Sequence, residues 1–153
     1  MSVKSQENNM RRLADLLSQD LSYIGGEREC GPNGAKKTFL NLGKVFLRAL
    51  SKDLGLRDAK ITSNPGGIAV SGDCTLIGMW ENNGIYISLG QILSDKRTVL
   101  LYRTTRHIRD YTGGRNQLLT VEDLRVLSYP DLLKKFGALR KEDGIHERHG
   151  RAA

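Results

Sequence analysis

The turn signals between Ala59 and Thr105 constrain the fold more than any other feature of this chain. Before Ala59 the apolar residues recur every three to four positions, whereas after it they form short blocks with strand-like alternation. The blocks are separated by Asn64–Gly67, Gly72–Asp73 and Asn82–Gly84, which are typical of hairpin turns. Connections of this length are too short for parallel crossovers, so the pattern predicts an antiparallel meander.

The meander is expected to contain four or five strands. Between Ile85 and Leu89, the residues Ile85, Ile87 and Leu89 share one face, while Tyr86 and Ser88 point to the other. That alternation is typical of a sheet covered on one face only. The predicted strands are Ala59–Ser63, Ile68–Ser71, Cys74–Trp80, Ile85–Leu89 and Thr98–Thr105.

Two amphipathic helices are predicted ahead of the sheet. The first is expected to end at Gly25-Gly26, and the glycine-rich loop that follows contains Asn33, a candidate cap for the second helix. The second spans Ala35–Leu54 and is expected to end at Gly55. The apolar face of the first helix comprises Leu13, Leu16, Leu17, Leu21 and Ile24. That of the second comprises Phe39, Leu42, Phe46, Leu47, Leu50 and Leu54.

A basic stripe lies on the second helix, roughly opposite its apolar face. The stripe consists of Lys37, Lys44, Arg48 and Lys52. Because these residues fall within a narrow arc away from the core, they do not compete with the packing of the helix. Solvated helix faces carry such stripes as well, so the sequence leaves open whether this one binds a partner.

The chain after the sheet predicts two short helices and a tail. Thr120 begins a capping arrangement for a helix at Val121–Leu127, and Ser128 begins one for a second helix. Residues 1–140 are therefore predicted to form a single α+β domain, with helices packed on one face of the sheet. Residues 141–153 are predicted to be a mobile polar tail.

The composition favours a polyanionic partner. The 153 residues include 24 Lys and Arg against 17 Asp and Glu, giving a formal net charge of +7 and an isoelectric point near 9.6. Such a charge attracts nucleic acid, although a basic balance also serves solubility alone. No signal peptide and no stretch of the roughly 20 apolar residues that span a membrane is visible. We therefore expect a cytoplasmic protein without a membrane partner, in which Cys30 and Cys74 are reduced thiols.

An arginine-rich segment follows the last predicted strand and is the candidate functional surface. Guanidinium groups bind phosphate bidentately, the Gly113-Gly114 backbone would allow close approach, and Tyr111 would stack on an unpaired base. The alternative is that Arg103 and Arg106 pair with Asp110 and only fix the loop. The candidate residues of the segment are Arg103, Arg106, His107, Arg109, Tyr111, Arg115 and Asn116.

Catalytic and metal-binding signals are weak. A phosphodiesterase would use His107 as base, Arg109 or Arg115 to stabilise charge, and Tyr111 as nucleophile or donor. The segment has a single histidine and few acids, so we expect no enzyme. The two histidines of the tail lack a third ligand, so no metal and no cofactor are expected.

Four stretches of the chain stand out as a group: Gly66–Asp73, Gly78–Trp80, Leu101–Arg103 and Asp110–Asn116. Together they resemble a poorly characterised domain carried by conjugative plasmids, integrative elements and phages. The resemblance covers the region between Lys37 and Leu119 and assigns no catalytic residues. It implies a small accessory protein of a mobile element that binds nucleic acid or inhibits host nucleases.

The sequence therefore predicts a non-enzymatic accessory protein of a mobile element that binds nucleic acid through the arginine-rich segment, with the basic stripe as an additional surface. An inhibitor of a host defence complex, such as an anti-CRISPR or antirestriction factor, would use the same arginines against a protein or a protein-bound nucleic acid. A phosphodiesterase is the third hypothesis.

Overall fold

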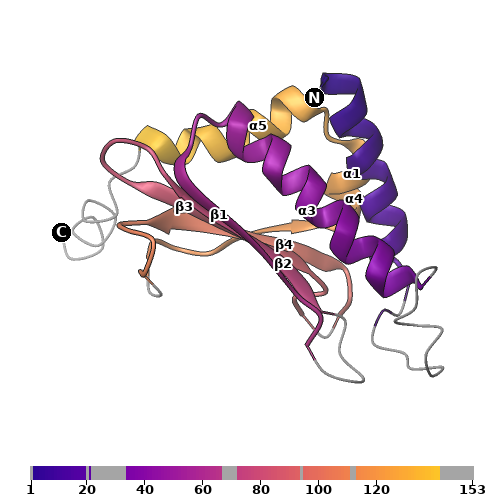
Figure 1. The fold of residues 1–153 in the computed structure, drawn as a ribbon. Helices are drawn as coiled ribbons and strands as arrows, with labels where there is room; N and C mark the ends of the chain where they lie inside the picture. The colour runs from indigo at the N-terminus through magenta and orange to yellow at the C-terminus, as the bar shows by residue number, and fades with distance from the viewer. Residues whose placement is uncertain are drawn as a thin grey trace.

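The computed structural model describes residues 2–19, 21, 34–66, 72–93, 95–110 and 113–141. Figure 1 shows two layers, an antiparallel sheet and a set of helices that all lie on one face of it. This is the predicted α+β architecture, in which the described residues form two helices before the sheet and two after it.

The first helix, α1 (Val3–Leu17), ends before the predicted stop at Gly25-Gly26. The Ser2 side chain caps its start by accepting a hydrogen bond from the Ser5 backbone N–H. At its end, the hydroxyl of Ser18 donates to the Ala14 carbonyl beside the helical bond from the Ser18 N–H. Leu21 lies outside the helix yet is buried, and residues 22–33 are outside the described part of the chain.

The long helix α3 (Ala35–Asp53) agrees with the prediction. Its predicted apolar face is buried throughout and packs on the sheet and on α1. The helix is followed by Gly55, whose φ of 68° is in the left-handed region that favours glycine. The residue that precedes the helix is Gly34, which provides no side-chain cap, and Asn33 lies outside the described residues.

The five strands lie in the order in which they occur along the chain, as predicted for a meander. They are β1 (Arg57–Asn64), β2 (Asp73–Met79), β3 (Gly84–Gly90), β4 (Thr98–Thr105) and β5 (Gln117–Thr120). The predicted strand Ile68–Ser71 falls in the segment 67–71, outside the described residues. The sequence did not predict β5, which forms because Leu118 and Leu119 pair with Leu101 and Leu100 of β4.

The two faces of the sheet differ as the alternation in β3 predicts. Ile85, Ile87 and Leu89 are fully buried beneath the helices, while Tyr86 and Ser88 lie half-buried on the opposite face. The strand register places Tyr86 directly opposite Arg103 of β4, so these two side chains share the face away from the helices.

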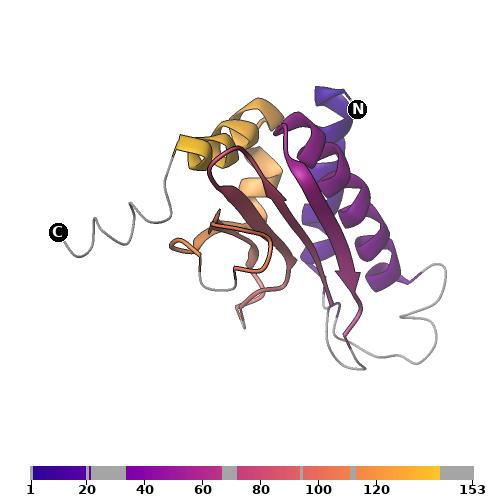
Figure 2. The same cartoon turned by 60° about the vertical axis from the view of Figure 1, so that its left-hand side comes forward.

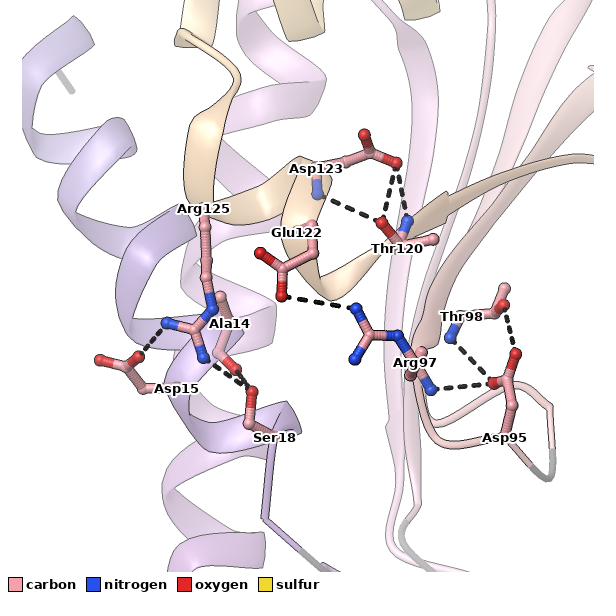
Figure 3. Close-up of polar contacts among 10 residues, drawn as sticks. All are labelled: Ala14, Asp15, Ser18, Asp95, Arg97, Thr98, Thr120, Glu122, Asp123 and Arg125. Atoms are coloured by element: carbon pink, nitrogen blue, oxygen red, sulfur yellow. Dashed lines mark hydrogen bonds and ion pairs between the residues drawn. The ribbon is translucent and has the colours of Figure 1, made fainter.

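The C-terminal helices close the core. They are α4 (Val121–Val126), α5 (Tyr129–Gly137) and the short 3-10 helix η1 (Ala138–Lys141). The predicted caps are present: Thr120 and Asp123 form a reciprocal capping box, drawn in Figure 3, and Ser128 accepts from the Asp131 N–H. Residues 142–153 of the predicted tail lie outside the described residues. Of the helices that the structure describes, none is long and apolar enough to cross a membrane.

Candidate nucleic-acid-binding surfaces

Arg103, at the end of β4, is turned into the protein and not toward solvent. Only 8% of the residue is exposed. Its guanidinium donates to the carbonyl oxygens of Thr104 at 3.1 Å and Asp110 at 3.0 Å, and its Cζ lies 4.7 Å from the centre of the Tyr86 ring. Arg103 therefore anchors the loop that follows β4.

Gly113 lies directly against this buried guanidinium. A Cβ added at Gly113 would clash with Nη1 of Arg103 and with the carbonyl oxygen of Thr104. The neighbouring Gly114 N–H donates to that same carbonyl at 3.0 Å. The glycine pair thus lets the loop return closely along β4.

Arg106 is paired with Asp110. Its Nε and backbone N–H donate to Oδ2 at 3.0 and 2.9 Å, and its Nη2 donates to Oδ1 at 3.2 Å. The Gly113 N–H adds a further bond to Oδ1 at 3.1 Å. The pKa of Arg106 is raised, first by its hydrogen bonds to Asp110 and then by the negative charge of that carboxylate. This is the internal pairing that the sequence left open as the alternative to binding.

The remaining described candidates of the segment are exposed, namely His107, Arg109, Arg115 and Asn116. The backbone N–H of Arg109 donates to Nδ1 of His107 at 3.2 Å. The guanidinium groups of Arg109 and Arg115 have no hydrogen-bond or ion-pair partner among the described residues. Tyr111, the proposed stacking or nucleophilic residue, is outside the described part of the chain. We call the pair Arg109 and Arg115 the loop surface.

The stripe on α3 forms a second basic surface, here called the α3 ridge. Lys37, Arg48 and Lys52 are exposed and Lys44 is half-buried. Within the described residues, none of these side chains makes an ion pair or hydrogen bond. Lys44, Arg48 and Lys52 are each four positions apart, which places one cation on every turn, about 6 Å apart along the axis. The ridge therefore presents a row of positive charges that form no ion pair with any described residue.

The only acid of α3 is Asp53, which lies beside the end of this row. Asp53 accepts the hydroxyl of Tyr129 at 2.6 Å, a bond that links the end of α3 to the start of α5. Arg48, Lys52 and Asp53 border a shallow hollow of about 300 Å³ whose apolar lining is Val45 and Ala49. Val45 is 40% exposed, so the ridge combines charge with a small apolar area.

The two surfaces lie on opposite sides of the protein. The apolar face of α3 packs on the sheet, so its ridge points away from the sheet. The described residues of the loop between β4 and β5 pack against Arg103 on the other face of the sheet, and Figure 1 and Figure 2 both show this loop on the side away from α1 and α3. The sequence candidates therefore separate into two groups, which the structure does not bring together.

The described residues add no metal-binding cluster to these surfaces. In the described parts of the chain, no three His, Cys, Asp or Glu side chains gather as metal ligands would. No family model, curated protein or solved structure matches the chain.

Proposed function

We propose that this protein is a non-enzymatic nucleic-acid-binding protein whose α3 ridge contacts phosphates. The observation that carries the proposal is the row Lys44, Arg48 and Lys52, in which each cation is one turn from the next and lacks an ionic partner among the described residues. The formal charge of +7 supports the same partner, because a basic protein attracts a polyanion over long range.

The ridge destabilises its own helix when no partner is bound. Like charges four positions apart on a helix cost about 0.2–0.5 kcal/mol per pair. Lys44 with Arg48 and Arg48 with Lys52 are two such pairs, and the Asp53 carboxylate accepts the hydroxyl of Tyr129. A phosphate backbone lying along the ridge would replace this repulsion with attraction and release bound counterions.

The chemistry of the ridge favours binding that does not depend on base sequence. Lysine and arginine side chains on a helix face reach phosphates, which position a protein on nucleic acid but carry no sequence information. We therefore expect similar affinity for unrelated sequences of equal length. Because its partner is nucleic acid, we expect the protein to act in the cytoplasm, and a mobile element is the context that the sequence resemblance supports.

The test is a fluorescence-anisotropy titration of a labelled duplex with the double variant Arg48→Ala/Lys52→Ala. We expect binding at low salt and a loss of affinity on the order of tenfold or more in the variant, given the strength of charge-assisted contacts. The matched control is Arg57→Ala/Arg97→Ala, which removes the same charge from two exposed arginines already paired with Asp58 and Glu122. Equal losses in both variants, or no binding at low salt, would contradict the proposal.

One observation favours the inhibitor hypothesis as a second candidate. Val45 is 40% exposed beside Arg48 and Lys52, and a phosphate backbone has no need of that apolar contact. A protein partner with an acidic and apolar surface would contact both the two cations and Val45. Capture of a host complex that survives nuclease treatment and is lost in Arg48→Ala/Lys52→Ala would support an inhibitor. Loss of every partner on nuclease treatment would support direct binding of nucleic acid.

A further inference from the structure

We infer that the loop surface is a second anion-binding surface, separate from the α3 ridge, and that the protein therefore holds two nucleic-acid segments at once. This inference rests on the proposed function. Its basis is the position of the loop that carries Arg109 and Arg115: it packs against Arg103, whose side chain lies with Tyr86 on the face of the sheet away from α3.

Hydrogen bonds brace the described parts of the loop that carry Arg109 and Arg115. Arg103 holds the carbonyl groups of Thr104 and Asp110, and Asp110 binds the backbone N–H groups of Arg106 and Gly113. These bonds hold the backbone at Asp110 and at Gly113, next to each of the two described parts. A preorganised loop spends less of its binding energy on ordering itself when it meets a ligand.

The charges of the loop surface are not neutralised locally. Asp110 is the one acid between Arg103 and Asn116, it is 3% exposed, and its carboxylate is occupied by Arg106 and Gly113. The buried and paired arginines, Arg103 and Arg106, therefore serve as the brace. Arg109 and Arg115 remain exposed to meet an anion.

The thickness of the domain keeps the two surfaces apart. A helix layer and a sheet lie between them, and packed layers are spaced about 10 Å apart. Duplex DNA bends little over short lengths, since its persistence length is about 150 base pairs. A duplex of about 20 base pairs that lies along the α3 ridge cannot fold around to the loop surface. The loop surface is thus available to a second segment.

A bridging assay tests the inference. Two duplexes of about 20 base pairs, each too stiff to wrap the protein, carry a donor and an acceptor dye and are mixed with the full chain. Wild-type protein should give energy transfer that rises with protein, and then falls when excess protein places each duplex on its own molecule. Arg48→Ala/Lys52→Ala and Arg109→Ala/Arg115→Ala should each still bind one duplex by anisotropy, with energy transfer reduced to background. The control Arg57→Ala/Arg97→Ala should bridge as the wild type does.

The outcomes distinguish a failure of this inference from a failure of the proposed function. Wild-type binding without energy transfer would overturn the inference and leave the proposed function in place. Bridging that persists in Arg109→Ala/Arg115→Ala would also overturn the inference. In that case two associated copies, each holding one duplex on its α3 ridge, would account for the energy transfer. Absence of any binding by the wild type would overturn the proposed function, and the inference with it.

Discussion

Arg106 and Asp110 are joined side by side, with Nε to Oδ2 at 3.0 Å and Nη2 to Oδ1 at 3.2 Å. This pair determines which arginines of the arginine-rich segment are exposed to contact an anion. It assigns the single acid of the loop to one arginine, and it leaves Arg109 and Arg115 exposed without a partner among the described residues.

Replacing Asp110 with alanine should loosen the loop. The change leaves the backbone N–H groups of Arg106 and Gly113 without their acceptor, and an unsatisfied group costs about 1–3 kcal/mol. We expect the free energy of unfolding in urea to fall by about that amount. Arg106→Ala is the control and should cost less than Asp110→Ala, because its guanidinium is exposed to solvent that screens the pair and because the two backbone N–H groups keep their acceptor. Equal effects of the two changes would contradict this account of the loop.

Gly113→Ala should destabilise the protein through steric conflict. The added methyl group meets the Arg103 guanidinium and the Thr104 carbonyl, so either the loop or the buried arginine must move. Overpacking of this kind costs about 1–3 kcal/mol. Gly137→Ala is a matched control at the end of α5, where a Cβ meets nothing within 4 Å, and it should be neutral or stabilising. Thermal denaturation of both variants distinguishes the two sites.

Cys74 should be unreactive in the folded protein. Burial, followed by the neighbouring Asp73 charge, raises the pKa of the Cys74 thiol to about 12, while Lys44 lowers it. The thiolate is the reactive form, so alkylation at neutral pH should be far slower than for an exposed thiol. Peptide mapping after iodoacetamide treatment should find Cys74 labelled only once the protein is unfolded. Rapid labelling of native protein would show that the contact between α3 and β2 is open.

Asp95 should contribute to stability in a pH-dependent way. Backbone hydrogen bonds from Arg97 and then Thr98 lower the pKa of the Asp95 carboxyl, and Figure 3 shows both bonds. A lowered folded-state pKa gives stability above the unfolded pKa of about 3.9, which is lost as the pH falls through the folded value. Wild type should thus be more stable than Asp95→Asn at pH 7, and the difference should shrink in acid. A difference that is constant from neutral pH to strongly acidic pH would contradict this role.

The sequence predicted the elements that are strongly patterned. The six apolar residues between Phe39 and Leu54 recur at helical spacing and are followed by Gly55, so the bounds of α3 were predicted to within one residue. The strand β4 was predicted with its observed ends, Thr98 and Thr105. In contrast, β5 is four residues long and exists through its pairing with β4, which a single-sequence pattern does not reveal.

The candidate site was harder to predict because it depends on contacts between distant segments. An arginine at the end of a strand looks exposed in the sequence, but Arg103 is buried by Tyr86 of β3 and by the returning loop. The hydrogen bond at the end of α3 depends in the same way on a distant residue, because Tyr129, which donates to Asp53, lies 76 positions after it. The spacing of the ridge was visible in the sequence, whereas its lack of ionic partners was not.

The salt dependence of duplex binding tests the central claim most directly. The logarithm of the binding constant falls linearly with the logarithm of salt concentration, with a slope of about −0.9 for each phosphate neutralised. If Arg48 and Lys52 contact phosphates, Arg48→Ala/Lys52→Ala should reduce the magnitude of the slope by about 1.8 relative to wild type. The control Arg57→Ala/Arg97→Ala should leave the slope unchanged. A ridge variant with the wild-type slope would contradict the assignment of the α3 ridge to nucleic acid.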